Sequence, residues 1–447
     1  MKKFWMGLGL GLAVLGIVNG FPTDPLVFFG NSPKSADINL PKDKIYPQGQ
    51  VFPFAFYSAG GGTEKKSMDL LPPEIKAQDQ QKLADGKVNI FGPQYELNSS
   101  LIEDMAKYNV KGVYTLMATI DGKPVDLEYM THLAKTKGIL DTKAVYESIA
   151  GQVKAVAANK NIARWDIKPE ELRYWYLQDM ALLKTMCQAV HDNDPEKRPV
   201  SMYEPGHRNV EALTKTLGAG QDVCTKGVYT NYVGMKDQRV FVRWSTEVSV
   251  EAAKAANPNI SVTLLPEMFA DVSPDEVKNI PAWVKHDIYA GLVAGAKGVA
   301  VFSSRRRPKF EQREIYLNAY LEQAKILTAS GGVGSAFLFG KQMNDISVDP
   351  IAGPATVKFY YKPCKVEKEY PSLSFANIAW DNARYLIIVN STKETVKAAV
   401  SGLMYGKGVR VKELFSNEAA FPVGEGNFEE ELPPWGVLGY KIYNEEK

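Results

Sequence analysis

The sequence has few cysteines and few histidines. Three cysteines occur in 447 residues, Cys187, Cys224 and Cys364, and such an odd, sparse set excludes a disulfide framework and a thiolate zinc site. The four histidines are residues 132, 191, 207 and 286, and no two share a helix-face spacing. We therefore expect no metal, no cofactor, and a fold stabilised by burial of an apolar core.

Neither sign of charge dominates. The chain has 53 basic and 51 acidic residues, a formal net charge of +2, so no electrostatic reason exists to expect a nucleic-acid partner. Hydrophobic residues make up 45% and charged residues 23%, which is the composition of a globular protein. The length exceeds that of one ordinary domain and suggests two.

The apolar run at the N-terminus is too short to span a bilayer. Lys2 and Lys3 precede an apolar stretch over residues 4–18, which is about 15 residues where a spanning helix needs about 20. A basic segment followed by an apolar one and small residues is typical of a secretory signal. We expect residues 1–20 to be a cleaved signal peptide and 21–50 an N-terminal extension. The mature protein would then be secreted or periplasmic, without stable membrane insertion.

Short apolar runs alternate with amphipathic stretches from about residue 51 to 330. The predicted strands are 52–58, 87–93, 111–117, 161–167, 199–205, 224–232, 261–267 and 296–304. The clearest helical pattern covers 169–190, and a second begins with Ser273 and Glu276 at capping-box spacing. This alternation predicts an α/β fold, a (β/α)8 barrel, with a doubly wound open sheet as the alternative.

The pattern changes after about residue 333. Runs such as GSAFLFG, ATVKFYYK and ARYLIIVNST are short and are separated by turn residues. Such runs, with no clear helical stretch between them, predict a small antiparallel β-sandwich. We place the barrel domain at 51–330 and the sandwich domain at 333–447, with the small-residue stretch 329–335 as their boundary.

Polar residues follow the ends of the predicted strands, where a (β/α)8 barrel builds its active site. The candidate catalytic carboxylates are Asp166, Glu170, Glu204 and Glu267. The candidate substrate-binding residues are Tyr57, Tyr95, Trp165, Tyr203, Tyr229, Asn231, Arg305 and Arg306. Carboxylates, amides and aromatic rings suit the hydroxyls and C–H faces of sugars. The triplet from 305 to 307 could in addition hold a uronate or a sulfate.

Several of these residues also have a structural explanation. Glu170 follows Pro169 at the expected start of a helix, where acids are favoured by the helix dipole. Asp166 could cap the same helix, and the arginines could pair with acids on neighbouring loops. Glu267 lies between apolar residues, so its carboxylate must be either partnered or functional.

The stretches SMYEP, LLPEM, RWDIKPEELRYWYLQDM and PPWGVLGYKI resemble barrel glycoside hydrolases that carry a C-terminal sandwich. In the large retaining clan of these enzymes, the acid/base is a glutamate after the fourth strand, and the nucleophile is a glutamate ending the seventh. The resemblance therefore implies Glu267 as nucleophile and Glu170 as acid/base, although Pro169 stands where that clan usually has asparagine.

The sequence thus predicts an exported glycoside hydrolase that cleaves a poly- or oligosaccharide with a pair of carboxylates at the barrel mouth. The separation of the two carboxyl groups would decide between retention and inversion of configuration. A non-catalytic carbohydrate-binding barrel is the alternative. We expect a carbohydrate as the binding partner and no nucleic acid, and the sequence leaves the oligomeric state open.

Overall fold

The structure is a computed structural model that describes residues 28–30, 32–59, 72–93, 101–406, 408–416, 420–422 and 426–445. The expected signal peptide and Tyr95 lie outside these ranges. Within them, no helix combines the length and apolar character that crossing a bilayer requires.

Eight parallel strands close into a barrel, in the order β1-β10-β9-β8-β7-β6-β3-β2. The strands are β1 (Phe54–Phe56), β2 (Ile90–Phe91), β3 (Lys111–Met117), β6 (Ile162–Lys168), β7 (Val200–Glu204), β8 (Val223–Val228), β9 (Ser261–Pro266) and β10 (Val299–Val301). Each lies within or overlaps one of the eight predicted runs. The closed sheet confirms the predicted (β/α)8 barrel and rules out the open doubly wound sheet.

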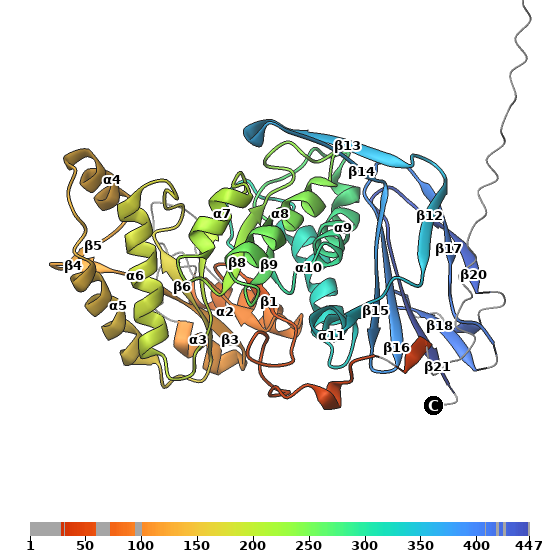
Figure 1. Cartoon of the computed structure of the whole chain (residues 1–447), viewed down its shortest axis with the longest axis horizontal. Helices are drawn as coiled ribbons and strands as arrows, with labels where there is room; N and C mark the ends of the chain where they lie inside the picture. Colours follow the sequence, from red (N-terminus) through yellow and green to blue (C-terminus); the bar gives the residue numbers. More distant parts are fainter. Residues whose placement is uncertain are drawn as a thin grey trace, which may run out of the picture.

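Helices cover the outside of the barrel (Figure 1). They are α2 (Pro73–Asp85), α3 (Leu101–Tyr108), α5 (Thr142–Val156), α6 (Leu177–Asn193), α7 (Val210–Leu217), α8 (Phe241–Ala256), α9 (Ile280–Val293) and α10 (Arg313–Leu327). Because the strands are buried between these helices and the barrel interior, their sequences are largely apolar. The large core cluster lies in the layer between strands and helices, and a smaller one, with Ala55, Val113 and Leu265, fills the interior.

The long connection between the third and fourth barrel strands holds extra elements. A hairpin of β4 (Thr119–Ile120) and β5 (Lys123–Pro124) is followed by α4 (Leu127–Thr136), and all three lie at one edge of the molecule (Figure 1). The carboxylate of Asp126 caps α4 by accepting the Tyr129 N–H at 2.9 Å. This insertion explains the wide spacing between the two strands.

The helix after β6 begins later than the sequence predicts. Residues 169–176 form an irregular segment, and α6 starts only at Leu177. The apolar periodicity of the segment misled the prediction, because Leu172 is buried there without being helical. Arg173 closes the segment onto α6 by donating to the carboxylate of Asp179 at 2.7 Å. Glu170 therefore lies on a loop, and the helix dipole does not explain its position.

Two antiparallel sheets form the C-terminal part, as predicted. One has the order β11-β15-β16-β21-β18-β19 and the other β12-β17-β20. Their bounds are β11 (Lys341–Gln342), β12 (Ser347–Ala352), β15 (Leu373–Trp380), β16 (Ala383–Asn390), β17 (Val396–Ser401), β18 (Val409–Glu413), β19 (Phe421–Pro422), β20 (Asn427–Leu432) and β21 (Val437–Asn444). Ile388 and Ile442 of the first sheet share a buried cluster with Val348 and Val400 of the second, so the sheets pack face to face.

The run GSAFLFG is not a strand but the helix α11 (Val333–Phe339). A short apolar run fits a strand and a buried helix equally well, and most of α11 is buried. At the capping box, the Ser273 hydroxyl does donate to the Glu276 carboxylate, but α9 begins only at Ile280, after a short 3-10 turn. The domain boundaries themselves stay a prediction.

A hairpin of β13 (Thr356–Tyr361) and β14 (Val366–Pro371) reaches from the C-terminal sheets to the barrel. Figure 1 shows it extending toward α8. The ring of Tyr361 lies 4.9 Å from that of Phe241 and 5.7 Å from that of Trp244, measured between centroids. The C-terminal part therefore contributes side chains next to the carboxyl ends of the barrel strands.

Candidate active site

Strand β6 carries charged residues on its inner face. Side chains alternate along a strand, so Arg164, Asp166 and Lys168 share one face, while Trp165 and Ile167 belong to the core beneath the helices. Asp166 is in register with Thr115 of β3 and with Ser201 of β7. A polar layer therefore crosses the interior of the barrel below its mouth.

Asp166 is buried without a hydrogen-bond partner among the described residues. It is 1% exposed, and neither carboxylate oxygen receives a donor there. Burial raises the pKa of Asp166 to about 6, against the opposing charges of Lys168 and Arg164. Within the described part of the chain, the hydroxyl of Tyr57 and two nitrogens of Arg164 are likewise buried without a hydrogen bond. Such a concentration of unsatisfied polar groups is unusual in a core and marks a candidate functional site.

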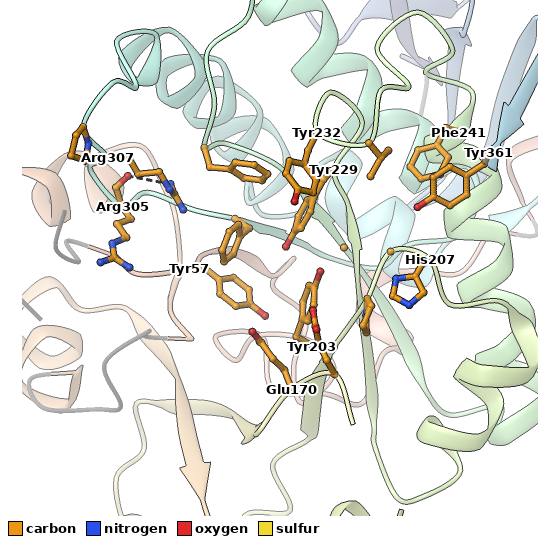
Figure 2. Close-up of a pocket in the computed structure, with 18 residues that line it drawn as sticks. Tyr57, Glu170, Tyr203, His207, Tyr229, Tyr232, Phe241, Arg305, Arg307 and Tyr361 are labelled. Carbon is orange, nitrogen blue, oxygen red and sulfur yellow. Dashed lines mark hydrogen bonds between the residues drawn. The ribbon is translucent and has the colours of Figure 1, made fainter. Parts of the chain in front are cut away.

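A cavity of about 870 Å³ lies at the carboxyl ends of the strands (Figure 2). Its wall includes Tyr57 after β1, Glu170 after β6, Tyr203 of β7, Tyr229 after β8 and Phe302 after β10. Three predicted tyrosines and one predicted carboxylate thus come together from four different strands. Tyr361 of the β13–β14 hairpin and His207 complete one end of the wall.

Much of the cavity wall is aromatic. The rings of Tyr203 and Tyr229 are inclined by only 15°, with centroids 6.4 Å apart. Tyr229 also lies 5.3 Å from Phe269 and 5.6 Å from Phe302. Gly227 permits this arrangement, since a Cβ at that position would come within 2.8 Å of the Tyr203 hydroxyl. Flat aromatic faces of this kind stack on the C–H faces of sugar rings.

Glu170 projects into the cavity. Figure 2 shows its carboxylate beside Tyr57 and Tyr203. The Lys168 ammonium donates to one of its oxygens at 2.7 Å, and both side chains are half-buried. The neighbouring Glu171, with a left-handed φ of 64°, also lines the cavity. The β6–α6 loop therefore delivers two carboxylates to the mouth.

Glu267 lies directly after β9, as predicted, but is not among the residues that line the cavity. Its carboxylate accepts the backbone N–H of Asn231 and, at 3.1 Å, that of Tyr232. The residue is 7% exposed, and burial raises its pKa to about 7, although the two N–H donors oppose the rise. Tyr232 and Phe269 both line the cavity, so Glu267 is held immediately behind the wall.

Glu204 is not brought to the cavity. It is fully buried on the outer face of β7, where Arg208 pairs with its carboxylate and the Gln221 amide donates at 2.8 Å. Burial raises its pKa despite these partners. The side chain is held in an ion pair of the fold and does not face the cavity.

Three predicted substrate-binding residues are also used elsewhere. Trp165 is fully buried beneath the helices and donates to Asp194 at 2.9 Å. The Asn231 amide binds Tyr316 at 3.1 Å, and Arg306 pairs with Asp79 of α2 at 2.8 Å. None of the three lines the cavity. Trp165 could not have joined Asp166 there, because neighbours in a strand face opposite ways.

Other cavity residues had no place among the predicted site residues. Tyr232, His207 and Tyr361 line it, and Tyr361 comes from a hairpin far along the chain. The only signal for it in the sequence was the strand-like run ATVKFYYK, which gives no hint of a contact with the barrel. Within the described residues, no group of three or more His, Cys, Asp and Glu side chains is placed to hold a metal ion.

A scan of the chain against protein-family models finds no match, and a search of curated proteins finds none either. Solved structures do match. The α-amylase from Geobacillus thermoleovorans, complexed with acarbose, is 8% identical, with a TM-score of 0.53 over 88% of this chain and 99% of that one. A family 42 β-galactosidase from G. stearothermophilus is 8% identical, with a TM-score of 0.53 over 88% of this chain and 98% of that one. A family 39 glycoside hydrolase from Bacteroides cellulosilyticus WH2 is 9% identical, with a TM-score of 0.51 over 88% of this chain and 81% of that one.

The chain has the fold of a barrel glycoside hydrolase. At 8–9% identity this likeness concerns the fold alone. In such a barrel, chemistry takes place at the carboxyl ends of the strands. That is the end at which the aromatic cavity and Glu170 lie.

Proposed function

We propose that the protein is an exported glycoside hydrolase that binds its substrate in the mouth cavity and uses Glu170 as acid/base. The observation that carries the proposal is the carboxylate of Glu170 in an aromatic cavity at the carboxyl ends of the strands. Export rests on the N-terminal segment, residues 1–20, whose pattern is that of a secretory signal.

Hydrolysis of a glycosidic bond needs a proton for the leaving oxygen and a second carboxylate that attacks the sugar or activates water. We assign the second role to Glu267, whose carboxylate has to pass the wall residues Tyr232 and Phe269 to reach a bound sugar. Support comes from its place after the seventh barrel strand and from its contact with the backbone of Tyr232, a wall residue. Because Glu267 must be ionised for this role and burial raises its pKa to about 7, activity should rise with pH across neutrality.

The test compares Glu170→Gln and Glu267→Gln with the wild type on aryl glycosides of good and poor leaving groups. Loss of the proton donor should lower kcat by about 10²–10⁴-fold for poor leaving groups and much less for good ones, which depart without protonation. Glu267→Gln should abolish turnover on both kinds of substrate while binding is retained. Glu211→Gln, on the exposed face of α7, is the matched control.

Wild-type turnover by Glu170→Gln on poor leaving groups would contradict the assignment of the acid. Absence of hydrolysis by the wild type across a broad panel of glycans would contradict the enzyme as a whole. The ion pair of Glu170 with Lys168 is half-buried, whereas that of Glu204 with Arg208 is fully buried, so we expect Glu170→Gln to fold.

A second function, a non-catalytic carbohydrate-binding barrel, is favoured by one observation. The carboxylates that line the cavity among the described residues, Glu170 and Glu171, are consecutive in one loop. The acid from another strand, Glu267, is engaged by two backbone N–H groups. Glycan binding by the wild type, unaccompanied by any turnover, would support the binding protein over the hydrolase.

A further inference from the structure

The segment after β10 turns two of its three consecutive arginines into the cavity. Arg305 and Arg307 line the wall, whereas Arg306 faces away. The guanidinium of Arg306 donates twice to the carboxylate of Asp79, at 2.8 Å each. Figure 2 shows Arg305 and Arg307 together at one end of the cavity, opposite the end formed by His207 and Tyr361.

The surrounding wall holds Arg307 and buries Arg305. The guanidinium of Arg307 donates to the Ser303 hydroxyl at 2.9 Å. It lies 5.6 Å from the ring centroids of both Phe269 and Phe302, which also line the cavity. Arg305 is only 6% exposed and yet reaches the cavity surface. Packing of this kind orients a guanidinium before a ligand arrives and so reduces the entropy lost on binding.

The charges that line the cavity are distributed unevenly. Two guanidinium groups lie at one end, while the carboxylate of Glu170 lies nearer the middle, beside Tyr57 (Figure 2). Glu171, which interacts electrostatically with His207, also lines the cavity. The planar fork of a guanidinium matches a carboxylate or sulfate with two parallel hydrogen bonds.

We infer that the cavity binds anionic glycans, with Arg305 and Arg307 holding the carboxylate of a uronic acid or a sulfate ester. This inference rests on the proposed function, because it names the substrate class of the same site. The aromatic wall from Tyr203 to Phe302 contacts the sugar rings, and the arginine end selects sugars that carry a negative group. Arg306, paired with Asp79, takes no part.

The experiment measures binding by calorimetry at low salt with three oligosaccharides of equal length. One contains uronic acids, the second is its carboxyl-reduced neutral counterpart, and the third carries sulfate esters. The wild type should bind at least one of the anionic glycans about 10–100-fold more tightly than the neutral one, as a charge-assisted hydrogen-bonded pair permits. Which anionic glycan binds distinguishes a uronate from a sulfate.

Arg305→Gln and Arg307→Gln should each remove most of this preference, because they weaken binding of the anionic glycans far more than binding of the neutral one. Arg306→Gln is the matched control and should keep the preference. Thermal unfolding of each variant shows that it is folded, and Arg307→Lys, which keeps the charge but loses the fork, should keep only part of the preference. High salt should weaken binding of the anionic glycans alone.

Equal binding of the neutral and anionic glycans, or a preference that survives in both glutamine variants, would overturn the inference. Hydrolysis of neutral glycans without a preference for anionic ones would overturn it while leaving the hydrolase intact. Tight binding of an anionic glycan without turnover would support the inference and overturn the hydrolase. Failure to bind any of the three would count against both.

Discussion

Replacement of Asp166 by asparagine should make the protein more stable above pH 6. The carboxylate of Asp166 is buried on the inner face of β6, and neither oxygen has a hydrogen-bond partner among the described residues. Asparagine has nearly the same shape and cannot ionise. The variant therefore removes the cost of burying the charge and sacrifices no hydrogen bond seen in the structure.

The size of the effect follows from the pKa of Asp166, which burial raises from 3.8 to about 6. The folded protein thus holds the proton more tightly than the unfolded chain, so the stability of the wild type falls as pH rises from about 4 to about 6. At about 1.4 kcal/mol for each pH unit, the full loss is about 3 kcal/mol. Asp166→Asn should recover it, and at about 2 °C per kcal/mol the melting temperature at pH 7.5 should rise by about 6 °C.

The assay is thermal unfolding of wild type and variant between pH 4 and pH 8. We expect the two melting temperatures to converge near pH 4 and to separate above pH 6. The control is Asp194→Asn, because hydrogen bonds from Arg198 and Trp165 outweigh the effect of burial and lower the pKa of Asp194. That variant should be destabilised, most strongly above pH 4, where the wild-type carboxylate is charged.

An Asp166→Asn variant that is less stable than the wild type at pH 7.5 would refute this reasoning. It would mean that the charged carboxylate stabilises the buried Arg164, or water inside the barrel, by more free energy than burial of the charge costs. We also expect the stabilised variant to lose activity. Asp166 interacts electrostatically with Tyr57 and Glu170. A buried carboxylate that costs stability at such a place is typically functional.

Two further predictions concern residues at the edges of the site. Glu204→Gln should lower the free energy of unfolding by about 3–5 kcal/mol, because Arg208 is left buried without its partner, while kcat of the folded protein stays unchanged. Denaturant unfolding measures the first quantity and kinetics at low temperature the second. A fall in kcat with unaltered stability would show that Glu204 takes part in catalysis. Tyr361→Ala should raise KM several-fold and leave kcat nearly constant, since Tyr361 lines the end of the cavity away from Glu170 (Figure 2). An unchanged KM on long oligosaccharides would show that the hairpin takes no part in binding.

The place of each barrel strand could be predicted because the signal is local. A short apolar run bounded by turn residues, followed by an amphipathic stretch, is a property of neighbouring residues, and β9 with its following glutamate shows it clearly. The same local rule failed at two places. The apolar spacing over 169–176 belongs to a loop, and the run 334–340 belongs to a helix, because a short apolar pattern reports burial rather than backbone conformation.

The direction in which each strand side chain points was harder to predict from the sequence, although β6 offered a signal. The alternation of Arg164, Asp166 and Lys168 with Trp165 and Ile167 separates a polar inner face from an apolar outer one. With that alternation, Trp165 could have been assigned to the core from the sequence. In β7 the pattern is less clear, because Glu204, on its outer face, finds Arg208 and Gln221 as partners beneath the helices.

By itself, the sequence determined the barrel, the sandwich and the polar residues that follow each strand, since all of these depend on residues close together in the chain. Only the tertiary structure decided that Glu170 projects into the cavity while Glu267 is held behind the wall by the backbone of Asn231 and Tyr232. It also brought Tyr361 to the barrel mouth. These contacts join segments far apart in sequence, and no local pattern encodes the packing that brings them together.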